Sequence, residues 1–471
     1  MFLAAFLDSS IWFPVLFSNL VLLPLILGVI IFFFAKPAFR YYLNEIGDYI
    51  IQRLLSDKYS QNIAEIITSL KRMSVLNMIE LNLRAQDGKT LKRPLGSPKH
   101  FPGYDLLMFS SSIMSKFSLP ESASIEMRVS IGPKSIKPLS ISIPLMISGM
   151  AYGLALSEQE KIALAKAAKT METATCSGEG PFLPEERQEA GKYILQISRW
   201  PWGGRTDEQI ALADMLEVQM GQGAEIGTYK VEAMEGKAQM LAGLVPGQSV
   251  VSLPAPPGVN SPQDWSIFMS TLRQKAKGIP IALKLMPTGH LEEDLAIALD
   301  LGFDAIVLDG AQGGSYGSTP IKQDDFGIPT INALVRANRF FKERGVREQI
   351  SIISAGGYFT PGECLKALAL GADAIYLGSI VLMASSSDQA DKVTPFEPPT
   401  TMVFYDSPTN SKDLCVNQAA ISVVNLLTSI VAEMKEGMRA LGKTSLKELS
   451  PDDLVALDSY TAEVTGVRRI Y

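Results

Sequence analysis

Eight short apolar runs, most of them followed by a stretch with helical spacing, dominate the middle of this chain of 471 residues. Helical patterns such as Glu158–Met171, Leu291–Leu301, Ile331–Arg344 and Pro361–Leu370 fill most of the gaps between the runs. Apolar strands that alternate with helices predict a parallel sheet. The expected strands are Leu145–Gly149, Thr173–Ser177, Tyr193–Ser198, Leu216–Met220, Ile281–Leu285, Ala305–Asp309, Ser351–Ala355 and Ile375–Gly378.

The number and spacing of these runs favour an α/β fold of one kind, the closed (β/α)8 TIM barrel. Such a barrel usually takes about 250 residues. A doubly wound open sheet is the alternative, and its dinucleotide-binding versions carry a G-x-G-x-x-G motif after the first strand. No such motif follows the run that ends at Gly149.

Small residues end the last two expected strands, at Gly356-Gly357 and at Gly378-Ser379. In a TIM barrel, the loops after strands seven and eight commonly bind phosphate beside a helix N-terminus. Glycine lets backbone N–H groups approach the phosphate oxygens. The alternative is ordinary strand-to-helix turn chemistry, which also favours glycine. We expect a phosphate site because both strand ends share the pattern.

One charged residue interrupts an apolar strand. Lys284 stands inside "IALKLMP", and a lysine buried without a partner is costly. It should therefore face the barrel pocket or form an ion pair. Other strand ends are polar and rich in glycine, as in "ISGMAYG", "TCSGEG", "VQMGQGAEIG" and "VLDGAQGGSYGS".

The composition excludes several classes of function. The net charge of −6 and the pI near 5.3 give no basic footprint for nucleic acid. Cys176, Cys364 and Cys415 lie too far apart for a disulfide framework or a C-x-x-C metal site. With only two histidines, His100 and His290, a histidine-rich metal site is not expected.

The N-terminus differs from the rest of the chain. No charged residue occurs between Ser9 and Ala35, which is long enough for a spanning helix of about 20 residues. No positive region precedes it, as a signal peptide would require. A buried soluble helix is the alternative. Lys36, Arg40 and later basic residues follow directly, so the remainder of the chain is expected in the cytoplasm.

We expect three parts in the chain. Residues 1–37 form a single transmembrane anchor, and residues 38–96 form a juxtamembrane helical segment. Within it, Ala38–Asn82 has amphipathic spacing, which suits either the membrane surface or packing on its own domain. The Gly/Pro-rich stretch Gln86–Asp105 is a linker or an extended segment that wraps the next domain. Residues 97–471 form the barrel domain with C-terminal helices.

Several motifs, taken together in their order, resemble the FMN-binding domain of glutamate synthase. The resemblance includes the methylamine–glutamate N-methyltransferase C subunit and runs from about Ser97 to the C-terminus. It rests on "SPKHFPGYDLLMF", "SGMAYGLALS", "SGEGPFLPEER", "VQMGQGAEIG", "LDGAQGGSYGS", "SAGGYFTPGECLKALALGADAIYLGS" and "GKTSLKELSPDDLVALDSYTAEVTGV".

The resemblance implies FMN across the barrel mouth. Lys284 would lie near N1 and the C2 carbonyl of the flavin, where a cation favours reduction, and Gln222 would hydrogen-bond the polar edge of the ring. Glu179 would face the substrate, although a carboxylate at a helix start is an equal alternative. The remaining implied residues are Gly356, Gly357, Gly378 and Ser379 for the phosphate, Ser148, Gly149, Met150 and Ala151 beside the ring, and Asp309, Gly313 and Gly314 over ring and substrate.

Two departures from the family pattern limit what the resemblance implies. Family enzymes carry a cysteine cluster after the eighth strand, whereas residues 365–414 contain no cysteine. We therefore expect no iron–sulfur cluster and no metal. The N-terminal cysteine that releases ammonia from glutamine is also missing. We therefore expect an electron-donor partner in place of the cluster, or an amidotransferase partner in place of this cysteine.

Two hypotheses of different class follow. The first is a membrane-anchored FMN oxidoreductase that acts on a C–N or imine bond, with a 2-iminoglutarate-like acid as the family expectation. Lys284 would stabilise reduced flavin, and Glu179 would handle a proton. The second is a non-catalytic flavoprotein-like membrane subunit or sensor. The retained glycines and Lys284 favour the enzyme.

Overall fold

The computed structural model describes residues 9–471 except 59–60, 63–64, 94, 229, 232–233, 390–391, 393–400 and 406–410. Of helix α1, the side chains before residue 32 and that of residue 33 are also outside the description. The chain divides into two compact units, Met1–Thr90 and Leu91–Tyr471. The sequence analysis placed this boundary after residue 96 instead.

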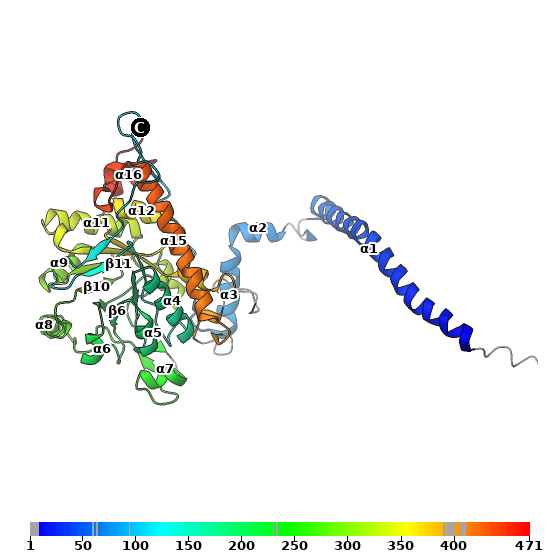
Figure 1. Cartoon of the computed structure of the whole chain (residues 1–471), viewed down its shortest axis with the longest axis horizontal. Coiled ribbons are helices and arrows are strands. Elements are labelled where there is room, and N and C mark those ends of the chain that lie inside the picture. Colours follow the sequence, from blue (N-terminus) through cyan, green and yellow to red (C-terminus); the bar gives the residue numbers. More distant parts are fainter. Residues whose placement is uncertain are drawn as a thin grey trace, which may run out of the picture. The chain divides into compact units, whose positions relative to one another are not determined.

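The second unit is a closed barrel of eight parallel strands, which confirms the predicted fold (Figure 1). The strands pair in chain order, and the last strand pairs with the first through Ile375↔Leu145. Strands β10, β11 and β12 have the predicted bounds, and the others differ at their ends. The barrel strands are β4 (Leu145–Ile147), β5 (Ala174–Cys176), β6 (Lys192–Ile197), β7 (Met215–Gln219), β10 (Ile281–Leu285), β11 (Ala305–Asp309), β12 (Ser351–Ala355) and β13 (Ala374–Leu377).

Alternation along the strands sorts their side chains into two buried sets. Ile281, Leu283 and Leu285 of β10 join the core between barrel and helices, whereas Ala282 joins the core inside the barrel. Since successive side chains point to opposite faces, Lys284 shares the interior face with Ala282. The lower interior is apolar, and its upper layer, toward the carboxyl ends of the strands, is polar.

Helices surround the barrel, as the β/α alternation predicts. They are α4 (Glu158–Thr170), α5 (Pro184–Glu189), α6 (Asp207–Ala211), α7 (Gly236–Leu241), α8 (Trp265–Ala276), α9 (Leu291–Asp300), α10 (Pro320–Asp324), α11 (Thr330–Glu343), α12 (Pro361–Ala369), α13 (Ser379–Ser386), α15 (Val416–Ala440) and α16 (Ser459–Thr465).

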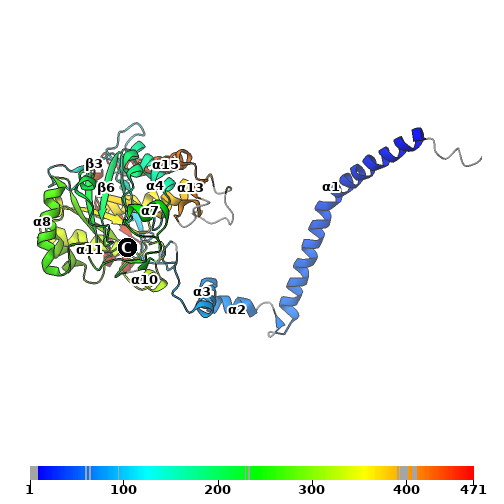
Figure 2. The same ribbon diagram turned by 90° about the horizontal axis from the view of Figure 1, so that it is seen from below.

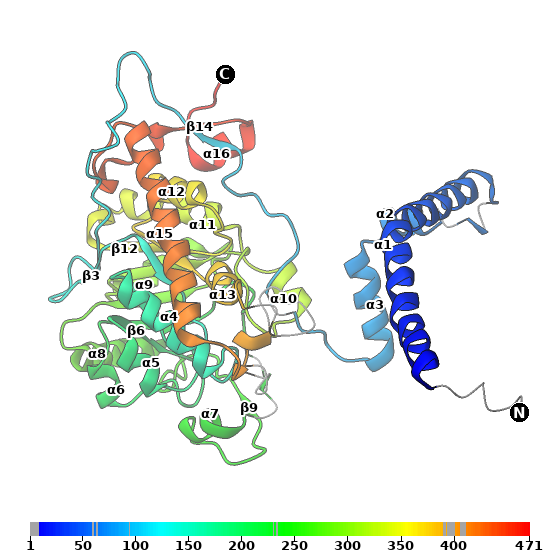
Figure 3. The same ribbon diagram turned by 45° about the vertical axis from the view of Figure 1, so that its right-hand side comes forward.

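Helix α15 is, among the described residues, the one helix that is long and apolar enough to cross a membrane. It lies along α4 and also contacts α12 and α13 (Figure 3). Val423, Leu427 and Met434 on its inner face are buried. This contact with the barrel accounts for its apolar composition.

Short antiparallel pairs complete the barrel unit. β2 (Val129–Ile131) and β3 (Leu139–Ile141) form a hairpin whose Ile131, Leu139 and Ile141 join the interior core of the barrel. The hairpin therefore closes the N-terminal end of the barrel. The other pairs are β1 (Leu107–Phe109) with β14 (Leu454–Ala456), and β8 (Lys230–Val231) with β9 (Val250–Val251).

The first unit consists of helices. α1 (Ser9–Ser56) is a single helix of 48 residues that contains the predicted spanning segment and continues beyond it. α2 (Glu65–Arg72) and α3 (Val75–Asp87) follow (Figure 2). Large apolar side chains in the second half of α1 are exposed, including Phe39, Ile46 and Leu55.

Candidate active site

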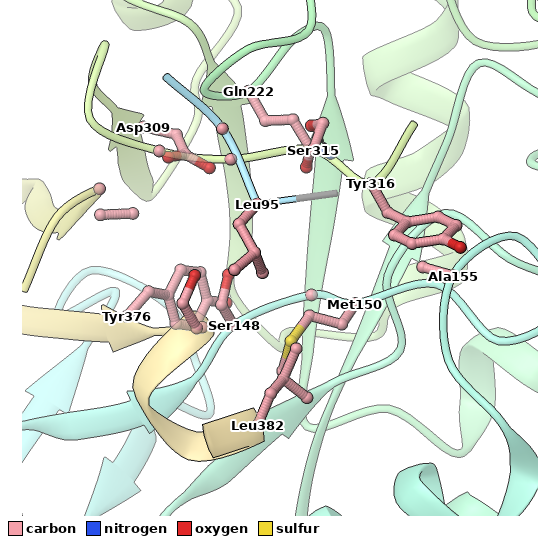
Figure 4. A pocket seen from close by; sticks show the side chains of 18 of the residues that line it. Leu95, Ser148, Met150, Ala155, Gln222, Asp309, Ser315, Tyr316, Tyr376 and Leu382 are labelled. Carbon is pink, nitrogen blue, oxygen red and sulfur yellow. Dashed lines mark hydrogen bonds between the residues drawn. The ribbon is translucent and has the colours of Figure 1, made fainter. Parts of the chain in front are cut away.

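The carboxyl ends of the barrel strands surround a cavity of about 440 Å³ (Figure 4). This volume lies in the range of about 300–1,000 Å³ that is typical of cofactor and small-molecule sites. Every residue that the sequence analysis assigned to the site lines the cavity, and their roles remain predictions. They are Ser148, Gly149, Met150, Ala151, Glu179, Gln222, Lys284, Asp309, Gly313, Gly314, Gly356, Gly357, Gly378 and Ser379.

One end of the cavity is formed by the glycines after β12 and β13. Gly356 and Gly357 have φ angles of +104° and +78°, which favour glycine. A Cβ on Gly357 would lie 2.6 Å from Cβ of Gln312. Helix α13 begins at Ser379, and no side chain caps it. Because the first N–H groups of a helix have no acceptor within it, this end of the cavity suits an anion.

Lys284 lies at the base of the cavity, and its side chain is only 1% exposed. Its Nζ is 3.1 Å from Oδ2 of Asp309 and 5.9 Å from the centre of the Tyr376 ring. Burial alone lowers the pKa of Lys284, but the charges of Asp309 and Glu217 outweigh burial and raise it above its ordinary value. Lys284 therefore stays protonated, both as a member of an ion pair and as part of the cavity wall.

Below Lys284, Glu217 of β7 is the centre of a buried polar cluster that the sequence analysis did not assign. Its carboxylate accepts hydrogen bonds from Tyr376 Oη at 2.9 Å and from Gln196 Nε2 at 2.7 Å. Burial, and then the charge of Glu217, raise the pKa of Tyr376 well above its usual value, so this tyrosine is a neutral donor. The signal in the sequence was a charge inside the apolar run "MLEVQM", as for Lys284.

Gln222 follows β7 and is held by two acceptors. Its Nε2 donates to Oε2 of Glu225 and to Oγ of Ser315, both at 2.9 Å. Glu225 in turn forms a buried ion pair with Arg199, whose Nη2 lies 2.7 Å from Oε1. Figure 4 shows Gln222 beside Ser315 at the cavity edge.

Glu179 follows β5 and lines the cavity with 6% of its surface exposed. Its backbone carbonyl accepts a hydrogen bond from Trp202 Nε1 at 2.9 Å. The alternative of a helix-start carboxylate is wrong, because the first turn of α5 carries Glu185 and Glu186 instead.

Lys161 of α4 holds the strand-end loops in place from outside the cavity. Its Nζ donates to the carbonyl oxygens of Met150, Cys176 and Ser177 at 2.8, 3.1 and 3.1 Å. It also lies 2.8 Å from Oε1 of Glu186, and both side chains are 1% exposed. This buried lysine positions the loop whose backbone lines the cavity.

A segment before the barrel supplies part of the cavity wall. Leu95, Gly96 and Ser97 line the cavity, and the Leu95 side chain points toward Ser148 and Met150 (Figure 4). Arg93 Nη1 donates to both carboxylate oxygens of Asp324 at 2.8 Å, and Ser97 Oγ donates to Oδ1 at 2.6 Å. Residues 93–97 of this Gly/Pro-rich stretch therefore pack against the barrel unit, whereas Gln86 and Asp87 end helix α3.

Apolar residues cover the other side. Tyr316 and Phe404 stack with ring centroids 4.7 Å apart, and Leu154, Leu382 and Met383 lie in the same wall. The sequence analysis assigned none of these, because an apolar residue that lines a cavity has the same sequence signal as one buried in the core.

The barrel unit is a parallel (β/α)8 barrel with a cavity at its C-terminal mouth, which is where TIM-barrel enzymes have their active sites. The family described as the conserved region in glutamate synthase matches residues 107–444. The chain therefore belongs to the glutamate synthase family, as its motifs predicted.

Two relatives and one solved structure each match most of this chain. The glutamate synthase large subunit-like protein of Rhizobium meliloti is 28% identical over 83% of this chain and 92% of its own. The archaeal-type glutamate synthase [NADPH] of Thermotoga sp. is 25% identical over 83% and 82%. The recombinant flavin-binding domain of baker's yeast flavocytochrome b2 has a TM-score of 0.50 at 17% identity, over 81% of this chain and 83% of that one, a likeness of fold.

Proposed function

We propose that this protein is a membrane-anchored, FMN-dependent oxidoreductase of the glutamate synthase type that acts on a C–N or imine bond of a small amino or oxo acid. One observation carries the proposal. Two glycine-rich strand ends, a helix N-terminus and the buried Lys284 converge on one cavity.

The described residues fit FMN. A Cβ on Gly356 or Gly357 would collide with Thr330 or Gln312, so glycine is required at this end of the cavity, and α13 begins at the same end. The backbone N–H groups at this end would hold a terminal phosphate. Backbone of Ser148–Ala151 would lie beside the ring, and Asp309 and Gly313-Gly314 would cover it.

FMN, when bound, supplies two-electron transfer at a C–N bond. The role of this chain is electrostatic and positional. Lys284 keeps a fixed positive charge at the base of the cavity, where it would stabilise the negative charge of a reduced flavin. Glu179 holds or accepts a proton at its carboxylate, and the stacked Tyr316 and Phe404 exclude water from the wall.

The test is the identity of the released cofactor. Full-length protein purified in mild detergent should be yellow, and chromatography after heating should give FMN rather than FAD, because the site suits one terminal phosphate. A folded, colourless protein that does not take up FMN would contradict the proposal.

The electron source is part of the proposal. The cysteine-free stretch 365–414 supports a route without an iron–sulfur cluster here, with electrons from an electron-donor partner and any ammonia free or from an amidotransferase partner. Because the name of the Thermotoga relative includes NADPH, a nicotinamide-dependent donor is the first one to assay. The same stretch favours the second candidate, a non-catalytic flavoprotein-like subunit, which substitution of Lys284 distinguishes below.

A further inference from the structure

We propose that the N-terminal end of the barrel is a membrane-contact surface, where a lysine-lined cleft binds the phosphate group of an anionic lipid and Ile136 enters the bilayer. The inference goes beyond the proposed function, because it concerns the end of the barrel opposite the active-site cavity and does not require flavin.

The cleft is a second cavity, of about 450 Å³, at the amino ends of β6, β7 and β10. Its wall includes the tip of the β2–β3 hairpin, the start of β6, the loop before β7 and the end of α8. The described lining contains a single carboxylate, that of Asp214, and four lysines, which are Lys137, Lys192, Lys275 and Lys277. The cleft is therefore positive, although the whole chain has a net charge of −6.

Two of the four lysines form ion pairs at the rim, and these pairs are Lys192 with Asp214 at 3.3 Å and Lys275 with Asp207 at 2.7 Å. For Lys137 and Lys277 the described part of the chain provides no ion-pair partner. Lysines at the end of a helix are common because the helix dipole favours them. That role accounts for the lysines of α8, but not for Lys137, which belongs to the hairpin.

The hairpin tip, residues 132–138, is fixed against the turn after α8. The backbone N–H of Lys137 donates to the carbonyl of Gly278 at 2.9 Å. A Cβ on Gly278 would lie 2.9 Å from Cβ of Ile136, so this close approach needs glycine. Ile136 is nevertheless 85% exposed, and it stands between Lys134 and Lys137 in the sequence. An exposed apolar side chain is thus held beside the cleft between two lysines.

The combination of charge and exposed apolar surface identifies the partner. Anionic lipids give the cytoplasmic leaflet a negative surface potential, and each lysine close to that surface strengthens binding by about fivefold. An apolar side chain beside such lysines gains from burial at the headgroup boundary. A soluble anion would contact the lysines but would leave Ile136 exposed. The lipid surface therefore accounts for both features.

A spanning α1 is long enough to permit this orientation. Its 48 residues measure about 72 Å, which exceeds the hydrocarbon core by about 40 Å. This excess is about twice the length of α8, which is about 18 Å for 12 residues. With the N-terminal end of the barrel on the bilayer, the active-site cavity would open away from the membrane. The contact is peripheral, so a carbonate wash would release it but would not release a spanning helix.

The test places a dye at the hairpin tip of the full chain, reconstituted in nanodiscs of phosphatidylcholine alone or of an equal mixture with phosphatidylglycerol. Ile136→Cys carries the environment-sensitive dye NBD in a Cys415→Ser background, because the other two cysteines, Cys176 and Cys364, are buried. In the anionic discs only, the emission should shift to the blue and be quenched by nitroxide-labelled lipid.

The matched label position is Ile267, which is 72% exposed at the start of α8, the opposite end of the helix from the cleft. A dye on Ile267→Cys should report water in both kinds of disc. Water-like emission at position 136 in both discs would overturn the inference. An equal blue shift in both discs would overturn the role of the lysines as a headgroup site.

Charge reversal tests the cleft itself. Lys137→Glu and Lys277→Glu should each lower the ratio of inserted to free hairpin tip by about fivefold or more in the anionic discs. The control is Lys92→Glu, which reverses an exposed lysine beside Arg93 near the barrel mouth and should leave the ratio unchanged. FMN content should be the same in all three variants, so the result does not depend on the proposed function. An unchanged ratio in a folded double variant of Lys137 and Lys277 would overturn the inference.

Inorganic pyrophosphate tests a soluble anion as the source of the phosphate. It is titrated by calorimetry into the chain in phosphatidylcholine discs. Binding that the double variant abolishes, together with no tip insertion in anionic discs, would assign the cleft to a soluble anion and overturn the membrane assignment. Tip insertion in anionic discs without pyrophosphate binding would support it.

Discussion

The enzyme hypothesis and the non-catalytic subunit hypothesis predict different effects of substituting Lys284. Lys284→Met keeps the apolar stem and removes the charge 3.1 Å from Asp309. FMN should still bind through the glycine end, the flavin reduction potential should fall, and turnover should drop by about 10²- to 10³-fold, or about 2–4 kcal/mol. Redox titration and steady-state assays measure these effects.

The control for Lys284→Met is Arg336→Met, which removes one partner of the surface pair with Glu292. It should leave the potential unchanged. If Lys284→Met also leaves the potential unchanged while lowering the yield of folded protein, Lys284 is a structural ion-pair residue. The subunit hypothesis would then be favoured.

Glu160 of α4 gives a prediction for how the stability of the folded protein depends on pH. The side chain is fully buried, and burial, which outweighs the opposing effects of Ser385 and Lys161, raises its pKa to about 8. The unfolded carboxyl ionises near pH 4.5, so the folded state holds the extra proton between about 4.5 and 8. Stability should therefore decrease as pH rises through this window, by up to about 1.4 kcal/mol per pH unit.

Glu160→Gln should flatten this decrease and raise the melting temperature at pH 8 more than at pH 5. Glu292→Gln is the comparison, because the Arg336 hydrogen bond lowers the pKa of Glu292 and moves its effect to acid pH. A Glu160→Gln variant with the same pH slope as the parent chain would contradict a neutral buried Glu160.

At the scale of elements, the barrel could be predicted almost completely from the sequence. The runs that became β10, β11 and β12 have the predicted bounds. The predicted bounds of the other strands ran one or two residues too far at the C-terminal end, into the mostly small or polar residues of the loops at the barrel mouth. Most surrounding helices were equally visible, because their buried faces repeat at helical spacing.

Elements that depend on distant partners could not be predicted. Strand β1 exists because Leu107 pairs with Ala456, and the β2–β3 hairpin exists because its apolar residues fill the barrel end. None of these three strands, each of three residues, is long enough to have a periodic signal of its own. The cavity wall around Leu95 depends in the same way on the contact of Arg93 with Asp324.

The candidate site was predictable where a residue type was unusual for its place. Lys284 in an apolar strand and glycines at two strand ends were such signals. Glu217 carried the same signal and was missed. The pair Arg199–Glu225 joins loops after two different strands, so only the folded barrel brings it together.

For the whole molecule, the membrane anchor is the main prediction. Helix α1 has 48 residues and a length of about 72 Å, well beyond the hydrocarbon core of about 30 Å. Deletion of Met1–Lys36 should move the protein out of the carbonate-washed membrane fraction, and a reporter fused after Tyr471 should be active in the cytoplasm.

The second half of α1 has exposed apolar residues such as Phe39 and Ile46, which could also attach the protein to the membrane, and this second attachment can be tested. Deletion of Met1–Thr90, which ends at the unit boundary, removes them as well. Release only by the longer deletion would assign attachment to residues 37–90. Retention of the longer deletion in the membrane fraction would refute an N-terminal anchor, and a reporter active only outside the cytoplasm would refute the orientation.

The β2–β3 hairpin has a kinetic consequence. Because Ile131, Leu139 and Ile141 fill the N-terminal end of the barrel, the described cavity opens at the C-terminal mouth alone. A small electron donor and an electron acceptor that both reacted in this cavity would have to use one entrance in turn. The first product would then leave before the second substrate entered, and a large excess of either substrate should slow the cycle in steady-state assays.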